Sequence, residues 1–516
     1  MEGVCSPPLA ALSVLGGAFM GALAIAFASL REARATFAAR IKTLEQENPL
    51  AFIATDVSKF RHSFQITLPK CGVVMPVKGV HGQSYANWRA QITSLYGGPL
   101  EFYFCVESDQ DPAYPHIQRL RRENPEFRIH LCVAGVSWHC SQKIHNQLHG
   151  FELAMRSCEY VIVIDDDIQL HPGTIRAWVE ELEYDPRALL ASGYAFEFVG
   201  KEVTSWTPYL WMLWRLCAST GFNDPNDRPN NCWGALASGS QANVYGIIDA
   251  WRDGGYSEDF ISLSLARLHG RTIAVPKGDT ETSVRVALEF LHHRLSGLLD
   301  GSQPSRHCPK HHESYDFGDA PFSRFWNFMC RQVYVLTRTY ATGAQRYIAL
   351  GGATVNGVMH ASIFCGALCT ATFLLSFTAR LASAVVWQGA PAQAMGALFY
   401  IFGLLLFSLA AKRCLNTFAE LCNVLSPELP PIDLSHVKLI NVIIAYMIYA
   451  PIVPAATLTT LASSSILWSG VRFTCRNGRI SSMHRMDDAG RSYCVPREKK
   501  LLSENSPSAR SSMIRF

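Results

Sequence analysis

The chain has 516 residues, which is enough for two or three domains. Only 17% of the residues are charged and the mean hydropathy is +0.08, and together these values indicate membrane association. The net charge of +4 is too small to indicate a nucleic-acid partner, so we expect none. The 16 cysteines show neither a small-domain disulfide framework nor a structural zinc pattern, so we expect mostly free thiols.

An apolar segment lies near the N-terminus. Residues 7–30 carry no charge, and residues 9–30 as a helix would be about 33 Å long, enough to cross the hydrocarbon core. A cleaved signal peptide is the alternative, but no Lys or Arg precedes the segment. Basic residues follow it instead, namely Arg31, Arg34, Arg40 and Lys42. We therefore predict a retained membrane anchor over residues 1–31, with the next domain in the cytosol.

Residues 70–345 are expected to form an α/β domain. The predicted strands are Gly72–Val77, Glu101–Glu107, Arg128–Val133 and Tyr160–Asp165, and the predicted helices between them are Ser84–Tyr96, Pro112–Arg122 and Ser141–Arg156. This alternation indicates a mostly parallel sheet with helices on its faces, whose ligands bind beyond the carboxyl ends of the strands. We expect an insertion over residues 280–314, followed by an aromatic helix over Phe322–Tyr340.

Residues 346–470 contain the C-terminal apolar runs. They are Val358–Phe377, Met395–Ala411 and Leu439–Trp468, the last interrupted by Pro451 and Pro454, and they predict two or three membrane helices. Two crossings would place the chain end in the cytosol, whereas three would place it in the lumen. Residues 473–516 are polar, basic and rich in serine, and we predict a disordered tail there.

In the stretch YVIVIDDD an apolar run leads directly into Asp165, Asp166 and Asp167. Neighbouring carboxylates repel one another, and their burial without a partner is costly. The arrangement is favourable if a divalent cation bridges the carboxylates to a nucleotide diphosphate, with Asp165 and Asp167 as ligands of Mg²⁺ or Mn²⁺. The alternative is a set of acids that precede a helix starting at Pro172–Thr174.

The stretch GGYSEDF contains a second acidic pair. Ser257 is expected at an N-cap position, with Glu258 and Asp259 in the first helical turn. Ordinary helix capping would explain the pattern. The functional alternative is a catalytic base at a helix start, next to a Gly254-Gly255 loop that lets the backbone approach a substrate.

Two further polar groups are candidates for ligand binding. Lys143 and Asn146 share one helix face and could contact a phosphate and a nucleotide or sugar hydroxyl, or form a solvated face. Glu107 and Asp111 end the second predicted strand and could bind the base or ribose of a nucleotide, or be simple loop acids.

Taken together in this order, these segments resemble the ceramide glucosyltransferase family, most closely its plant-type members. The resemblance covers about residues 70–345 and the N-terminal anchor, and SGVRFTCRNGRI (469–480) looks like the end segment of the family. The stretches that carry it are VVMPVKG (73–79), NWRAQITSLYGGPLEF (87–102), VESDQDPAY (106–114), CSQKIHNQLHG (140–150), DDDIQLHPGTI (165–175) and RDGGYSED (252–259).

The resemblance implies an integral membrane protein of the Golgi or endoplasmic reticulum with a GT-A glycosyltransferase domain facing the cytosol. Members of the family transfer glucose from UDP-glucose to the primary hydroxyl of ceramide in the bilayer, with inversion. Carried over by position, the nucleotide site falls at Glu107–Asp111, the motif for a divalent cation (Mg²⁺ or Mn²⁺) at Asp165–Asp167, and the catalytic base at Asp259, with Glu258 beside it.

A late motif of the family is Gln or Arg, two variable residues, then Arg-Trp. The matching stretch here is Phe328-Met-Cys-Arg331-Gln332, which keeps Arg331 and lacks the Trp. Arg331 and Lys143 are expected to help neutralise the leaving UDP. The acceptor His of some members corresponds here to Trp214-Arg215, so no acceptor His is assigned. Five aromatic residues could line an acceptor mouth at the membrane or pack in a core: Trp206, Tyr209, Trp211, Trp214 and Trp233.

Two alternatives remain at this level. The same fold and sugar donor could serve another acceptor, such as a sterol, a diacylglycerol or a growing polysaccharide. The chain could also be a non-catalytic membrane scaffold with a metal-binding insertion, which would use the irregular cluster His292, His293, His307, Cys308, His311 and His312.

Overall fold

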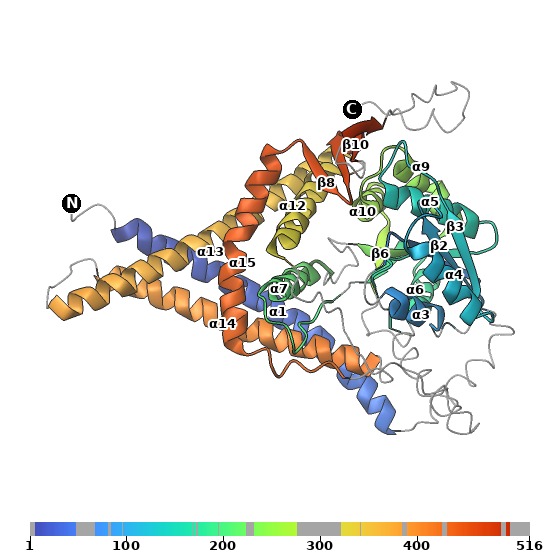
Figure 1. The fold of residues 1–516 in the computed structure, drawn as a ribbon. Coiled ribbons are helices and arrows are strands. Elements are labelled where there is room, and N and C mark those ends of the chain that lie inside the picture. The colour runs from blue at the N-terminus through green and yellow to red at the C-terminus, as the bar shows by residue number, and fades with distance from the viewer. Residues whose placement is uncertain are drawn as a thin grey trace.

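The computed structural model describes residues 6–47, 68–80, 84–94, 96, 98–168, 170–171, 174–193, 196–222, 232–275, 321–340, 342–383, 390–425, 431–486 and 492–495. An α/β domain lies beside a group of long helices that extends away from it (Figure 1). The insertion predicted over residues 280–314, with its histidines, lies outside the described residues.

The α/β domain is built on a seven-stranded sheet with the order β3-β2-β1-β4-β6-β5-β7. Strand β6 runs antiparallel to both neighbours, and the other neighbouring pairs are parallel. All six residues of β1 are buried, as expected for a strand covered on both faces. The strands are β1 (Cys71–Pro76), β2 (Leu100–Val106), β3 (Arg128–Val133), β4 (Tyr160–Val163), β5 (Ala188–Gly193), β6 (Trp233–Ser238) and β7 (Thr272–Ala274).

Helices connect these strands and cover the sheet. They are α3 (Ser84–Ile92), α4 (Ala113–Glu123), α5 (Gln142–Ala154), α6 (Thr174–Tyr184), α7 (Thr207–Ser219), α8 (Gly239–Val244), α9 (Ile247–Arg252), α10 (Glu258–Leu268) and α12 (Phe322–Arg338), with a short 3₁₀ turn η1 (Thr220–Phe222). Helix α5 lies directly on β1 and β2, where a Cβ on Gly150 would approach Cys105 Sγ to 2.5 Å. The strands and helices predicted between residues 70 and 165 are present, with ends shifted by a few residues.

Among the described residues, four helices are long and apolar enough to cross a membrane. They are α1 (Ser6–Glu47), α13 (Gly343–Ser383), α14 (Ala390–Leu425) and α15 (Leu439–Ala462). Helix α1 packs along α13 and α14. A Cβ on Gly403 would lie 2.5 Å from Gly17 O, so α1 and α14 approach closely where both residues are small.

Helix α15 differs from the other three in its surroundings. It continues through Pro451 and Pro454 as one helix and ends at Ala462. It contacts α7 and α12 of the α/β domain as well as α13 and α14. Figure 1 shows it running across the direction of α13 and α14.

The C-terminal residues form a second, four-stranded antiparallel sheet with the order β11-β10-β9-β8. Its strands are β8 (Ser465–Trp468), β9 (Val471–Arg476), β10 (Arg479–Met486) and β11 (Ser492–Val495). The prediction of a disordered tail over 473–516 is therefore wrong for residues 473–486 and 492–495, while residues 496–516 lie outside the described part.

The physical reason for this sheet is an alternating pattern inside a polar segment. Along β9, Val471, Phe473 and Cys475 are buried and point to one face. Asn477 and Gly478 have positive φ angles of 51° and 80°, which suit a two-residue hairpin turn between β9 and β10. The apolar face packs on residues of the α/β domain, among them Tyr256 and Tyr334.

Candidate active site

Lys143 joins the acidic segments that the sequence singles out. Its Nζ lies 2.6 Å from Asp165 Oδ1 and also pairs with Glu258 Oε1. Lys143 comes from the first turn of α5, Asp165 follows β4, and Glu258 opens α10. Stretches 140–150, 165–175 and 252–259 therefore converge beyond the carboxyl end of β4, the edge at which such sheets bind ligands.

The three aspartates after β4 have different environments. Asp166 Oδ2 accepts a hydrogen bond from Lys78 N at 3.4 Å, and its backbone oxygen accepts one from Trp88 Nε1 at 3.1 Å. Burial, with repulsion from the neighbouring aspartates, raises the pKa of Asp166 to about 8 and that of Asp167 to about 6. Full ionisation of the three carboxyls is therefore unfavourable in this turn unless a cation is present.

Asp165 is the member of this cluster that has a cation beside it. Burial alone would raise its pKa, but the charge of Lys143, helped by Arg215 and Arg331, lowers it below the usual value. The Asp165 side chain is 46% exposed, so the carboxylate is also accessible from solvent. Asp165 is therefore ionised at neutral pH and accessible to a ligand.

Glu258 and Asp259 begin α10, as predicted. Ser257 occupies the N-cap position, but its side chain makes no capping hydrogen bond. Glu258 is buried against Lys143, whereas Asp259 is half-buried. Burial raises the pKa of Asp259 well above its usual range, with Glu258 adding to the shift and Lys143 opposing it. Asp259 therefore has the environment of a stronger base than an exposed aspartate.

The predicted nucleotide-binding acids have protein partners of their own. Glu107 Oε1 pairs with Arg485 Nη1 at 2.6 Å. Asp111 Oδ1 accepts hydrogen bonds from Gly79 N and Ala113 N, both at 2.9 Å, and so ties the loops after β1 and β2 together. These contacts place both acids at the same edge of the sheet as Asp165.

Asn146 has a different place from the one predicted. It is buried, its Nδ2 donates to Cys105 O at 3.2 Å, and its Oδ1 accepts from Gln142 Nε2 at 2.8 Å. Both ends of the amide are thus bound within the protein. Asn146 supports Gln142 and does not share the ligand-facing position of Lys143.

Arg331 on α12 is directed toward the same site. Burial lowers the pKa of this guanidinium, while the charges of Asp165 and Asp167 favour its protonated form. Its guanidinium carbon lies 4.6 Å from the ring centroid of Trp468, in β8. A Trp is therefore present beside Arg331 in space, although the sequence has Gln332 where the family motif has Trp.

Several residues of the site were missed by sequence reasoning. Arg215 Nη2 donates to Glu197 Oε1 at 2.7 Å, and its charge acts on Asp165 and Asp167. The comparison with the family's acceptor His marked this position but gave it no role. The others are Lys78, Gln142, Trp468 and Arg485. Lys78 and Gln142 lie in stretches that carry the family resemblance and Trp468 ends a predicted apolar run, but the sequence assigns no role to any of the four.

The five aromatic residues proposed for an acceptor mouth divide into different environments. Tyr209 and Trp211 are buried, and the Trp211 ring centroid lies 3.9 Å from that of Phe328, so core packing explains these two. Trp206 is 37% exposed, and Arg215 lies over the Trp214 ring. The side chain of Trp233 lies outside the described part of the structure.

Oxygen ligands for a cation come from few protein groups. Among the described residues, no cluster of three or more His, Cys, Asp or Glu side chains could hold a metal ion. Asp165 and Asp167 alone would leave most of the coordination shell to other groups. Mg²⁺ and Mn²⁺ often bind in this way, with substrate phosphates and water as the remaining ligands.

The comparison with known sequences gives two matches. The family model "Glycosyl transferase family 21" matches residues 33–199. Ceramide glucosyltransferase 1 of Caenorhabditis elegans is 26% identical over 101 residues, which are 20% of this chain and 21% of that protein. The chain thus matches about a fifth of the length of this relative. These matches confirm the predicted resemblance, and the family model does so over residues 33–199.

Solved structures with similar folds were also found. The mannosyltransferase PcManGT from Pyrobaculum calidifontis, in complex with GDP-Man and Mn²⁺, has 12% identity and a TM-score of 0.34, covering 79% of this chain and 99% of that one. Glucosyl-3-phosphoglycerate synthase from Mycobacterium tuberculosis, in complex with Mn²⁺, UDP-glucose and phosphoglyceric acid, has 15% identity and a TM-score of 0.24, covering 40% and 69%. The predicted α/β domain with N-terminal and C-terminal apolar helices is confirmed by the seven-stranded sheet and the four long apolar helices of the described residues.

Proposed function

We propose that this protein is an inverting glycosyltransferase that transfers glucose from UDP-glucose to the primary hydroxyl of ceramide. The observation that carries the proposal is the ion-pair network of Lys143 with Asp165 and Glu258, adjacent to Asp259. It joins a candidate diphosphate site to a candidate base, beside helices that could hold the chain in a bilayer. The family match supports the reaction class, and the resemblance supplies glucose and ceramide.

Asp259 is proposed as the catalytic base. The ceramide hydroxyl is a poor nucleophile until its proton is removed, and Asp259 accepts that proton as the oxygen attacks the anomeric carbon in line. The raised pKa of Asp259 makes it a stronger base than an exposed aspartate. Glu258, which is paired with Lys143, holds the start of α10 against α5.

The leaving UDP needs positive charge beside its diphosphate. Lys143 and Arg331 supply part of it from the protein. Asp165 and Asp167 fit a divalent cation, because they offer hard oxygen ligands in a turn with uncompensated negative charge. When bound, such a cation stabilises the charge that develops on the leaving diphosphate. Glu107 and Asp111 are proposed to border the nucleotide.

The contacts of the C-terminal residues also limit the membrane topology that we propose. Arg485 pairs with Glu107, so the C-terminal sheet and the α/β domain lie on the same side of the membrane. An even number of helices must therefore cross between α12 and β8, where three candidates exist. We infer that α13 and α14 cross as a hairpin beside α1, and that α15 lies at the membrane surface.

Both ends of α15 support this assignment. His436 Nε2, just before the helix, lies 3.0 Å from Val199 O. Ser464 O, just after it, accepts a hydrogen bond from Tyr334 Oη at 3.1 Å. Because Val199 and Tyr334 belong to the α/β domain, a helix that crossed the bilayer could not make both contacts. Of the two alternatives left open by the sequence, the proposal therefore takes the one with two crossings and a cytosolic chain end.

The distribution of basic residues supports a cytosolic α/β domain. Arg31 and Arg34 follow the apolar part of α1, and Lys412 and Arg413 follow that of α14. Both helix ends lead toward the α/β domain (Figure 1), whereas the last turns of α13, Gly343–Ser383, contain Arg380 in sequence. The positive-inside rule then places the active site in the cytosol, and the resemblance supplies the Golgi or endoplasmic reticulum.

An epitope tag at the C-terminus tests the topology. In cells whose plasma membrane alone is permeabilised, we expect antibodies to reach both this tag and a tag in the α/β domain. A tag before Ser6 should stay protected in the same cells and serves as the control. Protection of the C-terminal tag would show that α15 crosses and would contradict the inference.

The reaction is tested with membranes that contain the protein, labelled UDP-sugars and a set of lipid acceptors. We expect labelled glucosylceramide from UDP-glucose and ceramide, identified by mass spectrometry, and none from the Asp259→Asn variant. Transfer to a sterol or a diacylglycerol instead would correct the acceptor alone. Absence of both transfer and cation-dependent hydrolysis of UDP-glucose would favour the scaffold alternative.

A further inference from the structure

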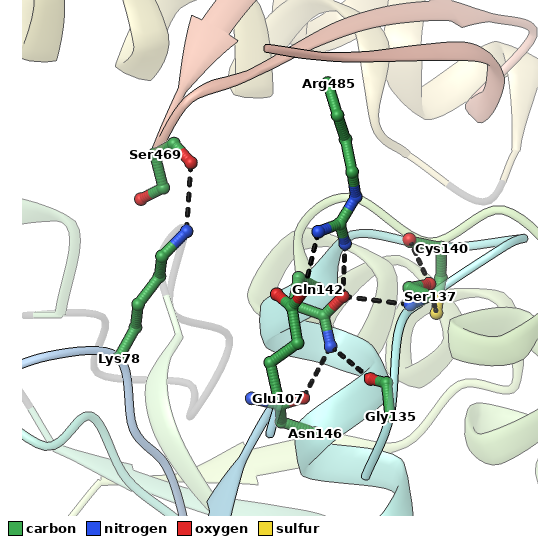
Figure 2. Close-up of polar contacts among 9 residues, drawn as sticks. All are labelled: Lys78, Glu107, Gly135, Ser137, Cys140, Gln142, Asn146, Ser469 and Arg485. Atoms are coloured by element: carbon green, nitrogen blue, oxygen red, sulfur yellow. Dashed lines mark hydrogen bonds and ion pairs between the residues drawn. The ribbon is translucent and has the colours of Figure 1, made fainter. Parts of the chain in front are cut away.

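The C-terminal sheet contacts several parts of the proposed active site (Figure 2). Arg485 of β10 reaches Glu107 and Gln142, and Ser469 O, between β8 and β9, accepts a hydrogen bond from Lys78 Nζ at 3.0 Å. Trp468 lies against Arg331. These contacts join residues at opposite ends of the chain, and neither the sequence pattern nor the proposed reaction accounts for them.

Arg485 holds two elements that border the nucleotide end of the site. Its Nη1 donates to Glu107 Oε1 and its Nη2 donates to Gln142 Oε1, both at 2.6 Å. The side chain of Arg485 is 14% exposed and that of Glu107 is 22% exposed, so water screens the pair only partly. A guanidinium binds two acceptors in one fixed plane, which a lysine cannot do.

Gln142 extends this contact into the loop before α5. Its Oε1 also accepts from Ser137 N at 2.9 Å, and its Nε2 donates to Gly135 O at 2.8 Å (Figure 2). One arginine from β10 therefore fixes the end of β2, the loop over residues 134–141 and the start of α5. Lys143, the next residue, is the cation proposed to meet the diphosphate.

Trp468 acts at the diphosphate end. Arg331 lies over its ring at 4.6 Å, within the distance of a cation–π interaction. The ring also packs edge to face with Tyr256, at a centroid distance of 5.5 Å. Tyr256 lies two residues before the first turn of α10, so one indole connects the proposed diphosphate arginine with the loop that carries the base.

The β9–β10 hairpin holds the same loop from the backbone. Ile480 N donates to Gly254 O at 2.8 Å, and Arg479 Nη1 pairs with Asp253 Oδ2 at 2.8 Å. Gly254 has a φ angle of +77°, and a Cβ there would lie 3.0 Å from Arg479 Cβ. The loop before Asp259 is therefore built to fit against the C-terminal sheet.

From these contacts we propose that the sheet β8–β11 is part of the active site and that Arg485 and Trp468 are positioning residues. Arg485 fixes Glu107 and Gln142 for the nucleotide, and Trp468 fixes Arg331 for the diphosphate. The inference rests on the proposed function, because it assigns these groups to a nucleotide-sugar donor. Side chains that are held in place before the ligand arrives bind it without a further loss of conformational freedom.

Arg485 is tested by substitution in the full-length protein in detergent. Arg485→Ala should raise the Kd for UDP and the KM for UDP-glucose about tenfold or more, with a smaller change in kcat. Arg485→Lys keeps the charge but not the planar guanidinium, so its Kd and KM should lie between those of the wild type and those of Arg485→Ala. Arg476→Ala, an exposed arginine of β9, is the matched control and should leave all three constants unchanged.

Trp468 is tested in the same assay with a different expected signature. Trp468→Ala should lower kcat about 3- to 30-fold with a smaller effect on the Kd for UDP, and Trp468→Phe should recover part of the loss. Thermal unfolding shows whether each variant is folded. If an alanine variant is unfolded, the inference is tested with the conservative variant of the same residue, Arg485→Lys or Trp468→Phe.

Folded variants of both residues with wild-type constants would overturn the inference and leave the sheet a purely structural element. An equal loss in Arg476→Ala would overturn it as well, because the effect would then be general to the sheet. Failure of the proposed function has a separate signature. The wild-type protein would bind UDP without glucosylating ceramide, while the effect of Arg485 on the Kd would still be measurable.

Discussion

The first half of the α/β domain and the C-terminal sheet contribute to the same site in different ways. Up to β4, each candidate residue lies next to the strand or helix that positions it, as Asp165 does after Val163. In the C-terminal sheet, Arg485 acts on Glu107 across 378 residues of chain. The difference indicates that a polar C-terminal segment can hold the proposed nucleotide end of the site through contacts with distant parts of the chain.

The comparison also explains how the chain can lack the Arg-Trp pair of the family motif. The sequence has Gln332 after Arg331, yet Trp468 of the C-terminal sheet lies over that guanidinium. Residues of the first half of the α/β domain are positioned by the strand or helix next to them in sequence. Residues of the C-terminal sheet reach the site through contacts between distant parts of the chain. Substitutions in the first region should therefore remove the chemistry, and those in the second should change how well it is aligned.

The largest effect is expected from the carboxylates after β4. Asp165→Ala and Asp167→Ala should each abolish transfer and weaken UDP binding, because each removes a proposed cation ligand. Asp166→Ala is the matched control and should be milder. Transfer and UDP binding are measured with Mg²⁺ or Mn²⁺ and again after chelation. Near-normal activity of Asp165→Ala in EDTA would contradict the proposed cation site.

A somewhat smaller effect is expected from the base. Asp259→Asn keeps the size of the side chain but cannot accept a proton, so turnover should fall about 10²–10⁴-fold with nearly unchanged donor affinity. Glu258→Gln should cost less, because its role is the ion pair with Lys143. Turnover and donor binding are measured separately. Normal turnover of Asp259→Asn with an inactive Glu258→Gln would move the base to Glu258.

The smallest effect is expected in the pH profile. Asp259 acts when ionised, so kcat/KM should fall as the pH drops through its pKa, which burial raises above the usual value of about 3.9. Lys143 opposes this rise. Lys143→Met should therefore move the acid limb to higher pH, besides lowering the rate, whereas Lys143→Arg should leave its position unchanged. If the acid side of the kcat/KM profile did not shift in Lys143→Met, a group other than Asp259 would control it.

The sequence by itself determined the parts of this protein that depend on near neighbours. The parallel strands appeared as short apolar runs, the acids stood at their ends, and α1 appeared as an uncharged segment long enough to cross a bilayer. Asp165, Lys143 and Glu258 could be named as candidates because each begins or ends a regular element. The convergence of the three on one ion-pair network needed the sheet order, which follows from packing.

Only the tertiary structure decided the rest. The tail appeared disordered because it is polar, basic and rich in serine, yet every second residue of β9 is buried against the α/β domain. The sequence spacing places Asn146 on the same helix face as Lys143, but its amide donates to the carbonyl of Cys105 inside the protein. The proposed number of crossings rests on where the sheet docks, because α15 is apolar enough to cross but both of its ends contact the α/β domain. Local pattern determines which surfaces are apolar, but contacts between distant segments determine what those surfaces cover.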